Sequence, residues 1–198
     1  MTLLGPSMPR LTRREMDLTC TIQMAKIKVK GSILGILTVY CPKKVGGPMQ
    51  IHTQCVNRIR KLRLQEEPIS VSKYQCDVIE RMAQSVQKKG GHLVIGGYFN
   101  EGDSETSKMT MCMRGLKLEK ASNLHGGDTP PTYVGGSKTI DHIWVSEEIV
   151  PLVNKMGYAP YNYGFHSDHR MSHVSLDLKE SGKQEESEPR WRILNSKN

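Results

Sequence analysis

Four polar residues that suit phosphate-ester chemistry stand where short apolar stretches of the sequence begin or end. They are Asn100, Asp141, Asp168 and His169. Two carboxylates, an imidazole and an amide can bind a cation, organise a phosphoryl oxygen and position a water molecule. Strand ends and their loops are where layered α/β proteins build their sites. The pattern therefore favours metal-assisted hydrolysis of a phosphate ester.

Alternating residues near the start of the chain predict a β-hairpin. Apolar and polar residues alternate over 22–29, a Gly31-Ser32 turn follows, and 33–41 is mostly apolar until Pro42 ends it. Residues 1–17 contain two prolines and three arginines and show little periodicity. We expect them to form a loose basic lead-in.

Helical spacing recurs in the middle of the chain, and further strand patterns follow it. Apolar residues recur at helical intervals over 51–64 and 74–86, which predicts two helices, or one helix broken at Pro68. A short helix is expected within 109–118 and a connector at 147–158. Further short apolar stretches predict strands at 92–96, 139–146 and 173–178.

The composition of the chain indicates a globular protein with a polyanionic partner. A chain of 198 residues with 37% hydrophobic and 24% charged residues fits a single globular domain. The formal net charge of +8 favours polyanionic partners such as nucleic acid. Five scattered cysteines without a Cys-x-x-Cys pair argue against a zinc knuckle and a disulfide scaffold. No apolar stretch approaches the about 20 residues of a membrane-spanning helix, so we expect no membrane partner and a cytoplasmic or nuclear location.

Four short motifs resemble those of the endonuclease/exonuclease/phosphatase superfamily, most closely the endonuclease domains of non-long-terminal-repeat retrotransposons. In the family's order they are Val39-Tyr40-Cys41-Pro42, Gly97-Tyr98-Phe99-Asn100, Ile140-Asp141-His142-Ile143 and Ser167-Asp168-His169. The resemblance implies an α/β fold of two stacked mixed β-sheets between helical layers, a DNase I-like sandwich. It also implies Mg²⁺-dependent hydrolysis of a phosphodiester in DNA. The matching part is the C-terminal half to two-thirds of the domain, which implies an N-terminally truncated domain.

The same resemblance assigns roles to individual residues. Asn100 would orient the attacking water, and His169, held by Asp141, would bind or protonate a phosphoryl oxygen. Asp168 would sit beside the cation as its ligand. Because the family groups these four residues, we expect their side chains to converge on one cleft, with His169 within hydrogen-bond reach of Asp141. The substrate-binding residues implied are Tyr40, Thr132 and Ser167.

Structural roles remain the alternatives for several of these residues. Asp168 and His169 fit a turn and cap as well as a site, and Tyr40 fits an ordinary strand aromatic as well as a phosphate contact. The basic run at 58–63 favours the solvated face of a helix over a DNA-binding stripe.

Two departures from the family place catalysis in doubt. The family's Gly-Asp-Phe-Asn aspartate is Tyr98 here, and a neutral phenol cannot replace a carboxylate as a base or a magnesium ligand. Loss of a positioned base costs about 10²- to 10⁴-fold in rate. The family's N-terminal asparagine and metal-binding Gln-Glu have no match in the 39 residues before Tyr40. We therefore expect impaired catalysis and weak or absent Mg²⁺ binding; the alternative is a non-catalytic remnant that binds nucleic acid or protein.

The expected organisation is a lead-in at 1–17, a partial endonuclease/exonuclease/phosphatase-like domain at 18–179, and a charged flexible tail at 180–198. A missing strand layer would uncover an apolar sheet face, which we expect to contain Ile36, Val39, Val94 and Ile143. The chain would then be marginally stable alone, self-associate, or cover the face with its first 30 residues. The partners expected besides DNA are a second copy or a complementing chain.

Overall fold

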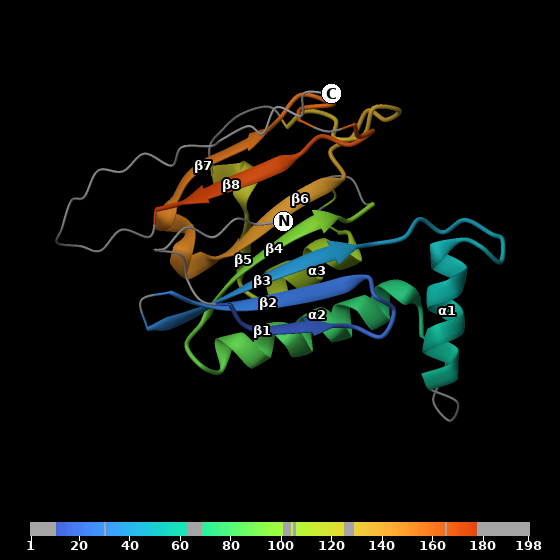
Figure 1. Ribbon diagram of the computed structural model, residues 1–198, viewed down its shortest axis with the longest axis horizontal. Coiled ribbons are helices and arrows are strands. Elements are labelled where there is room, and N and C mark those ends of the chain that lie inside the picture. The colour runs from blue at the N-terminus through green and yellow to red at the C-terminus, as the bar shows by residue number, and fades with distance from the viewer. Residues whose placement is uncertain are drawn as a thin grey trace, which may run out of the picture.

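The computed structural model describes residues 11–29, 31–62, 69–100, 104, 106–124, 129–164 and 166–177. A six-stranded sheet carries helices on one face and a two-stranded sheet on the other (Figure 1). The mixed α/β class with stacked sheets that the sequence predicts is confirmed. In chain order the elements are β1 (Leu11–Met16), β2 (Ile22–Val29), β3 (Ser32–Tyr40), α1 (Ile51–Leu62), α2 (Val71–Gln87), β4 (His92–Tyr98), α3 (Lys108–Gly115), β5 (Leu118–Lys120), η1 (Ala121–Leu124), β6 (Asp141–Ser146), η2 (Glu147–Leu152), β7 (Val153–Tyr158) and β8 (Ser172–Leu176).

The predicted hairpin is the antiparallel pair β2–β3, in register from Ile22 opposite Val39 to Val29 opposite Ser32. Gly31 lies in its turn with φ of 86°, a conformation that side chains with a Cβ rarely adopt. The predicted lead-in is wrong over 11–16, because these residues form β1 and pair with β2. The sequence shows no apolar alternation over β1 because its side chains are mostly charged and exposed, as is common in an edge strand.

The strand order β1-β2-β3-β4-β6-β5 determines where the site is built. β3 and β4 are parallel and are connected by α1 and α2, whereas β4 and β6 are antiparallel. The C-terminal ends of β3 and β4 therefore meet the start of β6 at one edge of the sheet (Figure 1). The sequence did not indicate β5, which is three residues long, or β7, which lies in the expected connector.

Two apolar layers cover opposite faces of the large sheet. On one face α2 and α3 bury a core that includes Leu37, Ile95 and Trp144. On the other face, Val94 and Ile143 are buried against a cluster to which β7 and β8 contribute. No helix in the described ranges combines the length and apolar character that a membrane crossing requires.

The apolar face expected to lose its cover needs one correction. Val39 lies on the helix-covered face and is 3% exposed, because side chains alternate along β3 and Val39 falls on the opposite side from Ile36. Val94 and Ile143 are also buried, whereas Ile36 is 37% exposed. Among the residues expected on this face, only Ile36, on β3, is exposed to solvent.

A buried polar network connects the turn between β1 and β2 to the end of β3. The Asp17 carboxylate accepts hydrogen bonds from the backbone N–H groups of Thr19 (2.8 Å), Thr21 (2.8 Å) and Ile22 (2.7 Å), and from the Thr19 hydroxyl. Gln75 on α2 donates its Nε2 to the Thr21 hydroxyl at 3.0 Å and to the Tyr40 carbonyl at 2.9 Å. The turn, the helix and the strand end are thus fixed together by satisfied polar groups.

We expect Asp17→Ala to lower the free energy of unfolding by about 3 kcal/mol, because it leaves several buried N–H donors without an acceptor. Chemical denaturation of the purified chain measures this change. Glu119→Ala, at an exposed carboxylate on β5, is the matched control and should cost no more than about 0.5 kcal/mol. Equal effects of the two substitutions would contradict the network's contribution.

Candidate functional site

Strand register places three polar or aromatic side chains in one row across the sheet. Tyr40 of β3 is opposite Tyr98 of β4, and Tyr98 is opposite Asp141 of β6. In-register residues of neighbouring strands project from the same face, so the three side chains lie side by side at the sheet's edge. The row is the base of the candidate site.

Gly97 permits this row because β3 and β4 approach closely beside it. It has a φ of 148°, and a Cβ at this position would collide with the backbone carbonyl of Val39. Only glycine fits there without displacing one strand from the other. Phe99 follows in the helix-side core, 2% exposed, and its N–H donates to the Ile140 carbonyl at 2.9 Å. Tyr98 therefore lies between Gly97, which packs against β3, and Phe99, which is held by Ile140 and by the core.

His169 joins the row from the loop that precedes β8. Its Nδ1 lies 2.8 Å from Oδ2 of Asp141, which is the contact that the resemblance implied. An isolated antiparallel bridge pairs His169 with Tyr133, and the Arg170 N–H donates to the Thr132 carbonyl at 2.8 Å. The backbone N–H of His169 also donates to the Ser167 hydroxyl at 3.0 Å. The imidazole is therefore positioned by its own loop and by a second loop.

One of the implied substrate-binding residues, Thr132, has a structural role. Thr132 is fully buried, and its hydroxyl accepts from the N–H groups of Ile140 (2.9 Å) and Asp141 (3.1 Å). A substrate contact by Thr132 is therefore wrong in this structure, because its oxygen is enclosed and holds the start of β6. The hydroxyl of the half-buried Ser167 accepts from the N–H of His169, and its contact with a substrate stays a prediction. Asp168 is exposed beside His169, and its backbone carbonyl accepts from Val134 at 2.9 Å.

Tyr98 places a ring and a hydroxyl where the motif that the sequence resembles has an aspartate. The hydroxyl donates to Oδ1 of Asn100 at 2.8 Å, and Asn100 takes a left-handed backbone conformation with φ of 53°. Burial, and then the neighbouring Tyr40 and Asp141, raise the pKa of Tyr98 above its ordinary value of 10.0. Tyr98 is thus a neutral hydrogen-bond donor at physiological pH, and it occupies the Asn100 oxygen.

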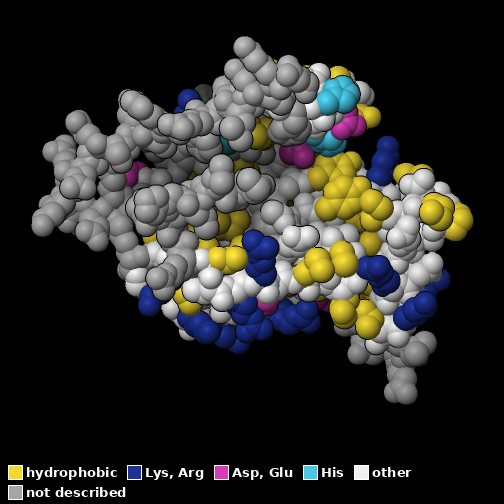
Figure 2. Space-filling view, viewed as in Figure 1, with side chains coloured by type: hydrophobic (Ala, Val, Ile, Leu, Met, Phe, Trp, Pro, Cys, Tyr) yellow, Lys and Arg dark blue, Asp and Glu magenta, His cyan; other side chains and the backbone are white. Residues whose placement is uncertain are grey.

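Aromatic rings surround the imidazole. The Tyr98 ring centroid lies 5.1 Å from that of His169 in an edge-on arrangement and 5.3 Å from that of Tyr40. Tyr133, which the sequence did not single out, lies 5.2 Å from His169 by the same measure. The only feature of the sequence that points to Tyr133 is its position next to Thr132. Histidine and acidic side chains lie next to a group of hydrophobic side chains near the edge to which β3 and β4 run (Figure 2).

The donor set at this edge does not fit the implied magnesium site. Mg²⁺ prefers near-octahedral oxygen ligands, with carboxylates prominent among them. The neutral phenol of Tyr98 replaces one carboxylate, and the Asn100 oxygen already accepts its hydroxyl. Within the described ranges no group of three or more His, Cys, Asp or Glu side chains could hold a metal ion.

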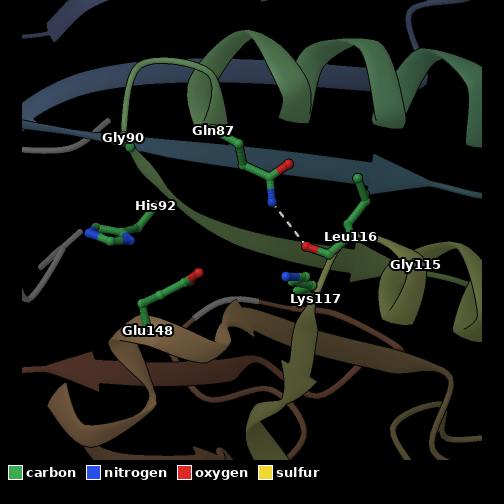
Figure 3. Close-up of a pocket in the computed structure, with 8 residues that line it drawn as sticks. Gln87, Gly90, His92, Gly115, Leu116, Lys117 and Glu148 are labelled. Carbon is green, nitrogen blue, oxygen red and sulfur yellow. Dashed lines mark hydrogen bonds between the residues drawn. The ribbon is translucent and has the colours of Figure 1, made fainter.

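Cavities occur elsewhere on the large sheet, near the opposite end of β4. One, of about 380 Å³, is lined by His92, Lys117 and Glu148, and Gln87 donates a hydrogen bond to the Leu116 carbonyl at its wall (Figure 3). A second, of about 270 Å³, also includes His92 and Glu148. None of the residues that the sequence predicts for the site lines either cavity. The candidate site is therefore distinct from both.

Helices on one face of a mixed sheet, a second sheet on the other, and an Asp–His pair at the strand ends define a DNase I-like α/β sandwich. No family model matches the sequence, and no curated protein sequence matches it. Solved structures do match, and this chain has the fold of the endonuclease/exonuclease/phosphatase structures.

Three of these structures illustrate the similarity, and each aligns with 85% of this chain. The endonuclease domain of TRAS1, a telomere-specific non-LTR retrotransposon, is 15% identical with a TM-score of 0.54 over 70% of its own chain. The 3′ phosphatase NExo from Neisseria, bound to a product DNA hairpin, is 14% identical with a TM-score of 0.55 over 72%. An AP endonuclease from Archaeoglobus fulgidus is 12% identical with a TM-score of 0.54 over 72%. The resemblance inferred from four motifs is thus confirmed as a similarity of fold.

The raised pKa of Tyr98 predicts a tyrosinate absorbance component that titrates above pH 10 and is missing in Tyr98→Phe. Burial also raises the pKa of Tyr74, so the difference between wild type and variant isolates Tyr98. Because the folded phenol holds its proton longer than the unfolded one, its contribution to stability is present below pH 10 and is lost as the pH rises through the folded pKa. Tyr163→Phe, at an exposed phenol, is the control and should retain the late component. A Tyr98→Phe curve identical to that of wild type would contradict the assignment.

Proposed function

We propose that this chain is a member of the endonuclease/exonuclease/phosphatase family that binds the phosphodiester backbone of DNA at the Asp141–His169 pair and does not hydrolyse it efficiently with Mg²⁺. One observation carries the proposal. The Asp141–His169 hydrogen bond is intact at 2.8 Å, whereas the position of the family's aspartate holds a neutral phenol that donates to Asn100.

Phosphate binding follows from the chemistry of the pair. A carboxylate on Nδ1 of His169 fixes the orientation of the ring and favours a proton on that nitrogen. A protonated imidazole can donate its remaining N–H to a phosphoryl oxygen. The net charge of +8 adds long-range attraction for a polyanion. Structures of the same fold include a 3′ phosphatase bound to product DNA, which supports DNA as the ligand.

Inefficient hydrolysis follows from Tyr98. Its raised pKa keeps it neutral, so it cannot accept a proton from water at physiological pH, and it offers no charge to a hard cation. It also engages the Asn100 amide oxygen that would otherwise be available to position water. The Asp141–His169 pair can thus hold a phosphate, but Tyr98 leaves no carboxylate at the position where the family places its aspartate.

Residual Mg²⁺-dependent phosphodiester hydrolysis is the second candidate function, and the intact Asp141–His169 pair favours it. The first replacement ligands to suspect would be Glu101 and Asp103, which lie outside the described residues. A non-catalytic protein-binding role has no comparable support at this site.

Conversion of supercoiled plasmid to the nicked form in Mg²⁺ tests the proposal. We expect the wild-type rate to equal that of His169→Ala, while wild type alone retains DNA binding in fluorescence anisotropy, with affinity that falls as salt rises. We expect Tyr98→Asp to bind Mg²⁺ more tightly by calorimetry and to nick faster than wild type. Wild-type nicking about 100-fold above His169→Ala would instead establish the second candidate function.

A further inference from the structure

A continuous series of four rings crosses the candidate site, and we call it the ring ladder. Tyr40 packs against Tyr98 with an interplanar angle of 32°, Tyr98 and His169 meet edge-on at 89°, and Tyr133 packs against His169 at 42°. The centroid distances between successive rings are 5.3, 5.1 and 5.2 Å. The ladder therefore holds the imidazole between tyrosines.

Both ends of the ring ladder are open to solvent. Tyr40 is 40% exposed and Tyr133 is 37% exposed, whereas Tyr98 is half-buried between Tyr40 and His169. Each end ring is fixed by its neighbour in the ladder and by its backbone. Tyr40 is the last residue of β3, and its carbonyl accepts from Gln75. Tyr133 is bridged to His169 through the backbone. Two exposed rings thus lie at the two ends of the series that contains His169, and the Tyr133 ring also lies against Gly135.

Exposed tyrosine rings beside a phosphate-binding group can stack on the unpaired bases of a nucleic acid strand. Stacking on an aromatic ring needs a free base face, which an unpaired strand offers and the interior of a duplex does not. Such stacking tolerates any sequence because every base has a π-face. An exposed ring fixed in place loses little conformational freedom when a base stacks on it, which favours binding.

Basic residues flank both ends of the ring ladder. Lys43 and Lys44 follow Tyr40 closely in the sequence, and Lys138 lies in the loop after Tyr133; all three are exposed. Lys and Arg side chains lie close to the hydrophobic group at this edge in Figure 2. Phosphates on either side of a stacked base can pair with such ammonium groups. Alternation of aromatic and basic groups is typical of surfaces that bind single strands.

We propose that the ring ladder binds unpaired bases and that this protein prefers single-stranded DNA to duplex DNA. The proposal rests on the proposed function, because it assumes that the backbone phosphate lies at His169. It adds a substrate class: a strand whose bases are free on both sides of the bound phosphate.

Fluorescence anisotropy with a labelled oligonucleotide of about 16 nucleotides, the upper end of a single-strand site size, tests the preference. The same oligonucleotide annealed to its complement is the duplex probe, and both are measured at one salt concentration. We expect the single strand to bind at least about 10-fold more tightly, since stacking on even one ring is worth about 5- to 150-fold. Equal affinity for the two probes would overturn the inference and leave the proposed function standing. Failure to bind either probe would overturn both.

Variants of the end rings test the mechanism. Tyr40→Ala and Tyr133→Ala should each weaken single-strand binding about 5- to 150-fold, and each should weaken duplex binding less. Tyr40→Phe should retain the affinity, because the ring and not the hydroxyl is needed. Met111→Ala, at a side chain 55% exposed on α3, is the control and should have no effect. Circular dichroism checks that each variant folds. If Tyr40→Phe loses as much affinity as Tyr40→Ala, the hydroxyl binds the phosphate and stacking at Tyr40 is wrong.

Discussion

The pairing of β4 with β3 on one side and β6 on the other is the constraint on which the site depends. It places Tyr40, Tyr98 and Asp141 in one row, and it tolerates only glycine at position 97, where the backbones of β3 and β4 nearly touch. His169 reaches that row through a loop bridge and a carboxylate contact rather than through the sheet. A shift of one residue in β4 would turn Tyr98 toward the helices and remove the site altogether.

Most of the fold could be predicted from the sequence because its elements are long and strongly patterned. The β2–β3 hairpin, the two helices and β4, β6 and β8 follow apolar periodicity that the structure bears out. β1 escaped prediction because an edge strand with exposed charged side chains has no apolar face to reveal it, and β5 is too short to have a period. The expected face of Val39 was wrong because residues three apart in a strand point to opposite faces, so Ile36 and Val39 cannot share one.

The site was partly predictable for a different reason. A carboxylate and an imidazole are common in catalytic sites, and the order of the four motifs in the sequence predicted that Asp141 and His169 would meet. The structure places them in contact. Thr132 shows the limit of that reasoning, since a hydroxyl near a site can as well hold the backbone as touch a ligand. Tyr133 shows the opposite limit. Its importance arises only from ring packing against His169, which no spacing in the sequence encodes.

The candidate site collects residues that are far apart along the chain, and this has a consequence for folding. Tyr40, Tyr98, Asp141 and His169 meet only after the parallel crossover between β3 and β4 has closed, whereas the β2–β3 hairpin closes through one tight turn. Long-range parallel pairing is slow to form, so the hairpin is expected to form early and the site late. A ligand that binds there can be held only by the fully folded domain. Occupancy of the site thus opposes global unfolding of the chain and also any local opening that separates these residues.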